Sequence, residues 1–200
     1  RRERELGDQR AEGWAAPLTA LVPGLGWTFD RGFVAGITLS AREFLDHGAE
    51  LLRAAPIVFV TFRKLEGLLA EVLAMPEVAR LRAISLARCG VDYGDVAQLA
   101  TSANLAQLWW LDLGGNPIEL RGLRLLAGAQ ASLPKLRYLR LEGNAHDPRE
   151  SIGVEWGRVV DVQLPPEGAQ LERDFGHVPW LHVGTEDANA YPPSPLQAPS

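Results

Sequence analysis

The chain has 200 residues, of which 46% are hydrophobic and 22% are charged, a balance typical of a folded domain or an elongated array. Its net charge of −5 argues against binding to nucleic acid or to an anionic membrane surface, because both depend mainly on Lys and Arg. The single cysteine excludes an intramolecular disulfide and fits the reducing cytoplasm, and no apolar run approaches the ~18 residues that a membrane helix needs. Because the sequence begins at Arg1 rather than at Met, we expect a fragment from which a leader could have been lost.

Residues 1–33 show no internal repeat, but they carry the aromatic residues Trp14, Trp27, Phe29 and Phe33. The residues that follow have the pattern of a stack of parallel strands. The first strand of such a stack exposes an edge and an open core. We therefore expect residues 1–33 to form a helical and aromatic cap.

A repeat with the pattern L-x-x-L-x-L-x-x-C/N occurs three times, beginning at Leu81, Leu108 and Leu136. The spacings of 27 and 28 residues lie within the roughly 20–29 residues of leucine-rich repeats. Three aligned copies make a specific signal, whereas one copy would be weak. The structural positions predicted for the three copies are Leu81, Ile84, Leu86 and Cys89; Leu108, Leu111, Leu113 and Asn116; and Leu136, Leu139, Leu141 and Asn144.

Weaker copies of the same pattern extend the array in both directions. Their apolar positions are Val34, Ile37 and Leu39; Ile57, Val60 and Phe62; Val159, Val162 and Leu164; and, at a short spacing, Val178, Leu181 and Val183. We place the array at residues 34–165 and a C-terminal cap at residues 166–189. Residues 190–200 hold four prolines and no charged side chain, which predicts a flexible tail.

Helical patterns separate the predicted strands. Ser40 and Glu43 form a capping box that opens the first helix, and Pro56 marks its end. Apolar residues recur at helical spacing in three later segments, 65–73, 96–103 and 120–127. Strands joined by crossover helices pair in parallel, and each unit is too small to bury its own apolar face. The sequence therefore predicts an α/β leucine-rich-repeat solenoid that is curved, with strands on its concave face and helices on its convex face.

The repeats resemble the ribonuclease-inhibitor-like class of leucine-rich repeats in length and in the Cys/Asn position. The segment from Trp27 to Val34, followed by Ile37-Thr-Leu39 and Phe44-Leu45, is similar to a bacterial family of repeat-companion-domain proteins. The opening Arg-Glu-Arg-Glu-Leu and the later Trp14-Ala-Ala-Pro-Leu18 resemble the connecting helix of that family. The resemblance spans roughly residues 1–145 and implies a degenerate repeat array behind a short N-terminal companion domain. That domain is missing from the sequence, which favours the fragment interpretation.

The residues that flank the buried strand positions should point to the concave surface, because side chains alternate along a strand. One row across neighbouring strands is Phe59, Ala83, Trp110 and Tyr138. Trp and Tyr are the usual anchors of protein interfaces, so we expect this row to face solvent and to bind a partner, and Trp110→Ala to leave stability nearly intact. The competing interpretation is that the rings pack on each other or on a folded-back C-terminal segment. The full set of predicted partner-binding residues is Phe59, Thr61, Arg63, Ser85, Trp110, Asp112, Tyr138, Arg140 and Glu142.

Other polar residues have plainer interpretations. Asp112 and Arg140 should be lateral neighbours, and a simple cross-strand ion pair is favoured over a recognition pair. Asn116 and Asn144 should satisfy turn backbone groups, and Cys89 at the same position should be a structural thiol.

His177 and His182, with Glu186 and Asp187, match no metal-ligand spacing, so we interpret them as solvated residues and expect no metal.

The sequence therefore predicts a non-catalytic scaffold that binds a protein partner through its concave face, without a cofactor, nucleic acid, membrane or small-molecule substrate. One alternative is a spacer that presents the missing companion domain. Another is an enzyme with a site at Cys89 or at the C-terminal histidines.

Overall fold

The computed structural model describes residues 13–155, 158–182 and 194–196, with the side chains of 152–155 and 158–161 excepted. Residues 13–21 form a helix. The elements that follow are β1 (Gly26–Asp30), β2 (Phe33–Leu39), α2 (Ala41–Ala54), β3 (Phe59–Phe62), α3 (Leu69–Ala74), η1 (Pro76–Arg80), β4 (Ala83–Ser85), α4 (Tyr93–Thr101), η2 (Ala103–Leu105), β5 (Trp110–Asp112), α5 (Leu120–Gly128), β6 (Tyr138–Arg140), β7 (Ser151–Glu155), β8 (Arg158–Gln163), α6 (Pro166–Phe175) and η3 (Pro179–Leu181).

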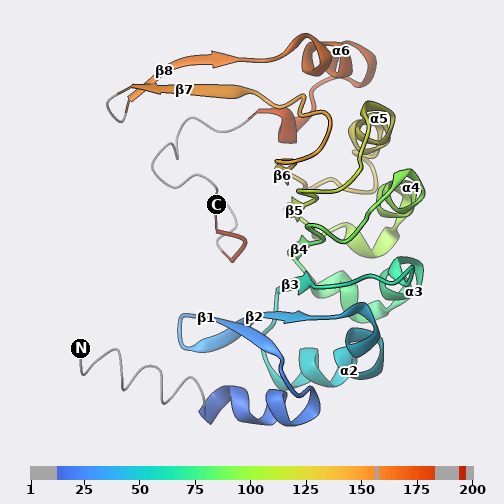
Figure 1. Cartoon of the computed structure of the whole chain (residues 1–200), viewed down its shortest axis with the longest axis vertical. Coiled ribbons are helices and arrows are strands. Elements are labelled where there is room, and N and C mark those ends of the chain that lie inside the picture. The colour runs from blue at the N-terminus through green and yellow to red at the C-terminus, as the bar shows by residue number, and fades with distance from the viewer. Residues whose placement is uncertain (1–12, 156–157, 183–193, 197–200) are drawn as a thin grey trace.

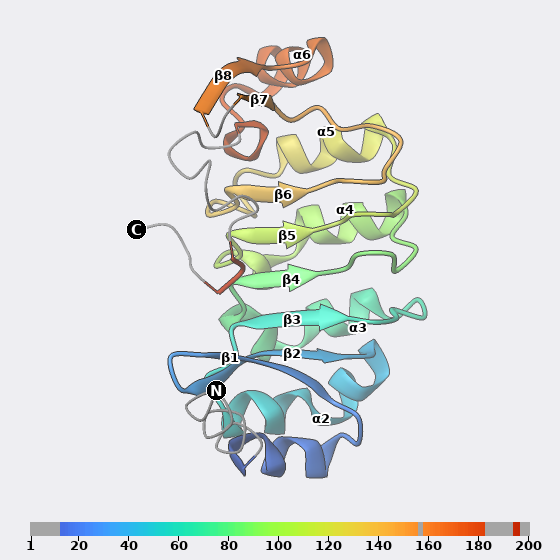
Figure 2. The same cartoon turned by 60° about the vertical axis from the view of Figure 1, so that its left-hand side comes forward.

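The fold is α/β and is built on a mixed, open sheet in which six strands lie in sequence order from β1 to β6. Strands β2 to β6 are parallel, and β1 runs antiparallel to β2 at one edge. Figure 2 shows the parallel strands stacked one after another along the long axis of the molecule. Strands β7 and β8 form a separate antiparallel pair.

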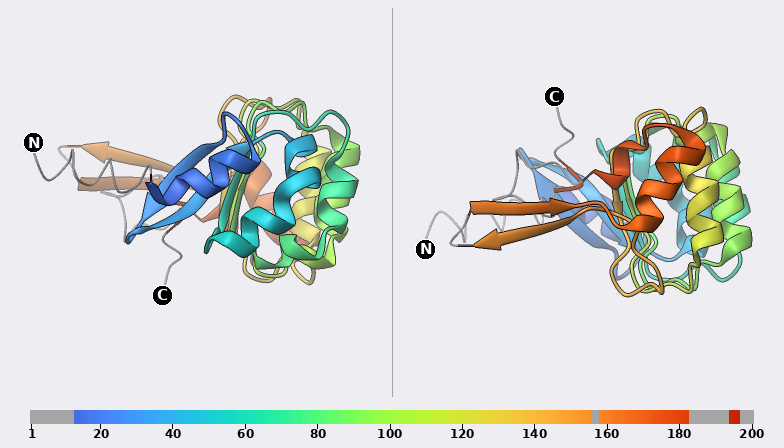
Figure 3. Two further views of the ribbon diagram at one scale, coloured as in Figure 1. Left: turned by 90° about the horizontal axis from the view of Figure 1, so that it is seen from below. Right: turned by 90° about the horizontal axis from the view of Figure 1, so that it is seen from above.

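Helices cover one face of the sheet, because each parallel neighbour must be reached by a crossover. Helices α2, α3, α4 and α5 lie side by side on that face (Figure 1). The main apolar core fills the space between the two layers and includes Ile84, Leu111 and Leu139 from successive strands. The end-on views of Figure 3 show the layer of α2–α5 on one side of the sheet, while the β1–β2 and β7–β8 hairpins project on the other side at the two ends, with the N-terminal helix beside β1–β2. We call the sheet face opposite α2–α5 the open face.

The predicted strand register is confirmed. Phe59, Ala83, Trp110 and Tyr138 are direct lateral partners across β3 to β6. The next outward row is confirmed as well, with Thr61, Ser85, Asp112 and Arg140 in register. A shift of one residue would have moved the core leucines to the open face, and the burial of all predicted repeat leucines excludes such a shift.

Two helices begin at capping boxes. At α2, Ser40 Oγ accepts the Glu43 N–H at 3.2 Å while the Glu43 carboxylate accepts the Ser40 N–H at 2.7 Å. This confirms the predicted start, and the helix ends at Ala54, before Pro56. At α4, Asp92 and Asp95 make the equivalent pair of bonds, which the sequence analysis missed. Helix α3 begins only at Leu69, later than predicted, because Glu66 and Gly67 both adopt positive φ.

The N-terminal segment contains a helix, as predicted, and also the unpredicted strand β1. Arg31 and Gly32 have φ of 47° and 89°, the conformation of a type I′ turn, which matches the natural twist of a two-residue hairpin. The turn folds β1 back along β2 and covers the edge of the parallel strands. Trp14 packs against Phe29 and Phe33 with ring centroids 5.9 and 5.6 Å apart.

The predictions for the C-terminal strands are wrong. Val159 and Val162 belong to β8, which Leu164 directly follows, and β8 pairs with β7 instead of extending the main sheet. The chain between β6 and β8 holds the loop of residues 141–150 and strand β7 in place of a crossover helix, so β8 is reached through a hairpin and pairs antiparallel with β7.

The segment proposed as a seventh copy is not a strand either. Pro179–Leu181 is a 3₁₀ turn, as expected for a proline that lacks an N–H, and Val183 lies outside the described residues. Helix α6 and η3 occupy the described part of the predicted 166–189 cap. Of the predicted tail, 190–200, the structure describes only residues 194–196. None of the described helices is long and apolar enough to cross a membrane.

Candidate functional site

The open face carries an apolar cluster of Phe59, Ala83, Trp109, Trp110 and Tyr138, which we call the aromatic cluster. It is separate from the main core because its strand residues alternate with the core leucines. Trp110 stacks on Tyr138 with centroids 5.9 Å apart and meets Phe59 edge-on at 5.6 Å. The small side chain of Ala83 lies between Phe59 and Trp110 in the register, so both large rings can lean over it and meet.

The expectation that this row faces solvent is wrong for its two largest members. Trp110 is 5% exposed and Tyr138 is 7% exposed, while Phe59 is half-buried. Trp110 packs against both Phe59 and Tyr138, and this contact agrees with one part of the competing interpretation, that the rings pack on each other. Trp109 also turns into this cluster. Trp110 Nε1–H is buried and has no hydrogen-bond partner among the described residues. The largest rings of the aromatic cluster are therefore buried, and contact between its members and a partner stays a prediction.

A polar network lies beside the aromatic cluster in the next row. Asp112, which is buried, accepts from Ser85 Oγ at 3.1 Å and from the Gly114 N–H at 2.9 Å. Its carboxylate also lies 3.7 Å from Arg140 Nη1, which confirms that the two residues are lateral neighbours. Arg140 reaches Glu142 at 2.9 Å, and this pair stays accessible to solvent. The network thus holds an ordered pair of opposite charges at the surface of the open face.

The remaining predicted binding residues lie toward β3. Thr61 is half-buried on the open face. Arg63 is exposed and donates to Glu43 at 3.1 Å and to the Gly24 carbonyl at 3.3 Å. The predicted set is therefore divided between buried members, Ser85, Trp110, Asp112 and Tyr138, and accessible members, Phe59, Thr61, Arg63, Arg140 and Glu142.

Cys89, Asn116 and Asn144 occupy equivalent turns and reach back to the preceding strand. Cys89 S–H lies 3.1 Å from the Phe62 carbonyl, Asn116 Nδ2 donates to Leu86 at 3.0 Å, and Asn144 Nδ2 donates to Leu113 at 2.9 Å. Asn116 Oδ1 also accepts the Val91 N–H at 3.0 Å. These bonds are of the kind that the predicted structural role requires.

The Cys89 thiol is not arranged as a nucleophile. Burial, helped by the negative charge of Asp112, raises its pKa to about 11. A nucleophilic cysteine needs the opposite shift, since the thiolate is the reactive form. The environment of Cys89 therefore argues against the enzyme interpretation built on it.

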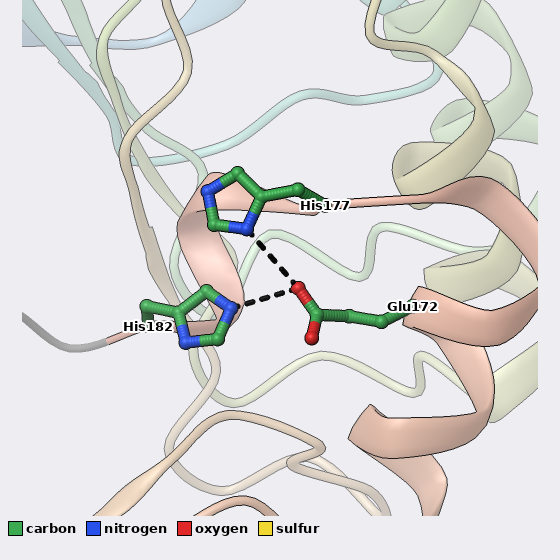
Figure 4. Close-up of side chains that lie close together, drawn as sticks. All are labelled: Glu172, His177 and His182. Atoms are coloured by element: carbon green, nitrogen blue, oxygen red, sulfur yellow. Dashed lines mark hydrogen bonds and ion pairs between the residues drawn. The ribbon is translucent and has the colours of Figure 1, made fainter.

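The last turns bring His177 and His182 to Glu172 (Figure 4), an arrangement that was not predicted from the sequence. Glu172 Oε1 lies 2.8 Å from His182 Nε2 and 3.3 Å from His177 Nδ1. His182 Nδ1 lies 2.7 Å from Glu150 Oε1. Gly176, at φ 79°, ends α6 and folds the chain back over Glu172. Gly176 was the available sequence signal for this chain reversal, because the spacing of the histidines and glutamates matches no metal-ligand motif.

The ionisation of this cluster reflects its contacts. The hydrogen bond with His182 lowers the pKa of Glu172, and the Val178 N–H assists. Partial burial opposes protonation of His182, but its bonds to Glu172 and Glu150 outweigh burial and raise its pKa. The side chain of His177 is 71% exposed, as expected for a solvated residue. Its contact with Glu172 was not predicted. Glu186 and Asp187, the other residues considered with the histidines, lie outside the described residues.

Comparison of the chain with protein-family models, with curated proteins and with solved structures gives no match.

Proposed function

We propose that the chain is a leucine-rich-repeat protein whose residues 34–141 form a short, curved solenoid of the ribonuclease-inhibitor-like kind. Support comes from identical backbone bonds in successive units, at the residues where each strand is entered. The amides of Leu81, Leu108 and Leu136 donate to Val78, Leu105 and Leu133 at 3.0, 2.9 and 3.1 Å. The side chains of Cys89, Asn116 and Asn144 repeat a second bond in the same units.

The function that the geometry favours is a non-catalytic scaffold that binds a protein partner on the open face. The observation that carries this proposal is the aromatic cluster on the sheet face opposite the layer of α2–α5. A monomeric domain gains most of its stability from the core between sheet and helices, and that core is a different cluster. Large rings on the second face, beside ordered charges, are typical of an interface with an apolar centre and a polar rim.

The contacts with the partner would be made by the accessible residues in and around the aromatic cluster. Phe59 and Thr61 would supply the centre, and Arg63, Arg140 and Glu142 the rim. Trp110 and Tyr138 would act mainly by holding Phe59 and the strands in place. The arrangement suits a partner with an apolar patch flanked by both signs of charge, because the exposed rim presents Arg63 and Arg140 together with Glu142.

A matched pair of substitutions tests the proposal. Thr61→Lys places a long charged side chain in the middle of the open face. Gln98→Lys makes the same change in charge at an exposed residue of α4. Both variants and the original chain would be compared by quantitative affinity capture from source-cell lysate, after circular dichroism has confirmed folding. We expect a specific partner to be retained by Gln98→Lys and lost by Thr61→Lys.

Two results would contradict the proposal. Equal retention by Thr61→Lys would place the binding surface elsewhere, for example on the helices. Capture of no specific protein by the original chain would favour the alternative in which the array is a spacer for a companion domain.

A further inference from the structure

Three side chains that can ligate a metal, Glu172, His177 and His182, meet in the described segment 158–182. Each of these residues offers one ligand atom, and the three atoms all lie within 4.8 Å of one another. They come from the last turn of α6, the bend after it and the end of η3. Figure 4 shows both rings directed at the same carboxylate oxygen. All three residues belong to one short segment, which folds back on itself at Gly176.

The ring of His182 has an acceptor at both of its nitrogens. Glu150 lies 2.7 Å from Nδ1 and Glu172 lies 2.8 Å from Nε2. A neutral imidazole has one N–H and one lone pair, so it can satisfy only one of the two carboxylates. When Nδ1–H donates to Glu150, the lone pair of Nε2 faces the lone pairs of Glu172. That contact is favourable only if a cation lies between the two atoms, either a proton on the ring or a metal ion.

We propose that Glu172, His177 and His182 bind one zinc-class divalent transition-metal ion, with Glu150 orienting the ring of His182 from behind. Two imidazole nitrogens and one carboxylate oxygen form a donor set that suits Zn²⁺ and leaves a fourth position for water or an acidic group. A carboxylate that accepts from the far nitrogen of a ligating histidine is the usual support for such a ligand. The proposal is independent of the protein-binding function of the open face.

The distances and charges fit this ion. Two ligands of a tetrahedral zinc ion, each at about 2.0–2.1 Å, lie about 3.3 Å apart. The separation of Glu172 and His177 is already 3.3 Å, and the Glu172–His182 separation of 2.8 Å requires a small opening. With both rings neutral, Glu150 and Glu172 leave the cluster with a negative charge that a divalent ion neutralises.

The test uses the full, tag-free chain, freed of metal with a chelator that is then removed. Isothermal titration with ZnCl₂ at pH 8 should give one bound ion per chain. His177→Gln removes an exposed ligand without disturbing the core, and we expect it to weaken binding by more than about tenfold. Glu150→Gln should weaken binding by about 10–100-fold through its effect on His182. His47→Gln, on α2, is the control and should leave binding unchanged.

A spectroscopic measurement separates ligation from a merely structural effect. Co²⁺ in place of Zn²⁺ should give the intense visible absorption of a tetrahedral ion in the original chain, and His177→Gln should lose it. The proposal is overturned if the original chain binds no Zn²⁺ at about 100 µM, a concentration well above the dissociation constants of structural zinc sites. Equal binding by the original chain and His177→Gln would overturn it as well.

Discussion

Asn116 and Asn144 make the same hydrogen bond one unit apart in the stack. Asn116 Nδ2 donates to Leu86 at 3.0 Å, and Asn144 Nδ2 donates to Leu113 at 2.9 Å. Each side chain therefore joins its own turn to the strand of the preceding unit. The Cys89 thiol makes the corresponding contact with Phe62. These side chains satisfy backbone carbonyls where the short strands end and their pairing stops.

Asn116→Ala should destabilise the chain strongly. The substitution removes the side-chain acceptor of the buried Val91 N–H, and the carbonyls of Leu86, Leu113 and Gly114 lose the amide that donates to them. Each buried polar group left unpaired costs about 1–3 kcal/mol, so we expect a loss of about 2–3 kcal/mol in unfolding free energy. Urea denaturation measures it. Asn144→Ala, at a half-buried position with a longer 3.4 Å bond to Ile118, should cost about 1 kcal/mol. Equal and negligible losses would contradict this role.

Trp110→Ala should also be destabilising, contrary to the expectation from sequence. The ring is 5% exposed and contacts both Phe59 and Tyr138, and removing a buried aromatic side chain costs about 3–5 kcal/mol. Trp14→Ala is the comparison, because Trp14 is 54% exposed and should cost less than about 1 kcal/mol. Thermal and urea unfolding of both variants would show whether the two losses differ. Similar losses would mean that the aromatic cluster is not packed as described.

The strand register could be predicted because side chains alternate along every strand. Leu111 must be buried if the chain is to fold, and that requirement alone places Trp110 and Asp112 on the opposite face. The turn positions of Cys89 and Asn116 follow from the same alignment. Periodicity and spacing therefore suffice for β2 to β6 and for the crossovers between them.

The remaining features depend on contacts that no local pattern encodes. Whether Trp110 is exposed depends on how it leans over Ala83 toward Phe59, two strands away. The apolar residues of β8 alternate like those of the repeat strands, so alternation could not reveal that β8 pairs with β7. Glu172 joins His182 only because Gly176 reverses the chain, and the spacing of these residues in the sequence has no recognisable period.

Cys89 should react slowly with iodoacetamide while the chain is folded. Burial raises its pKa from 9.0 to about 11, which lowers the thiolate fraction near neutral pH about 100-fold. The rate of alkylation at pH 7.5, followed by mass spectrometry, should rise by at least that factor in 6 M urea. A folded rate close to the unfolded rate would show that the thiol is neither buried nor raised in pKa, and would revive the nucleophile hypothesis.

The stability that His182 contributes should fall as the pH rises. Its pKa is raised above 6.5 in the folded chain, so its contribution is complete below about pH 6.5 and is lost as pH rises through the folded pKa. Glu172, whose pKa is lowered from 4.5, contributes above that value and loses its contribution as pH falls through the lowered pKa.

The measurement is the difference in unfolding free energy between the original chain and His182→Gln, in the presence of a chelator. We expect the largest difference between about pH 5 and 6.5 and a decline toward pH 9. A difference that is constant or that grows with pH would show that the two carboxylates do not hold a proton on His182.

Site-specific photo-crosslinking tests most directly whether the open face binds a protein. A benzophenone amino acid would replace Thr61 on the open face in one variant and Gln98 on α4 in another, both expressed in source cells and irradiated. The account predicts a discrete crosslinked partner from position 61 and none from position 98. The same adduct from position 98 alone, or from both positions equally, would contradict it.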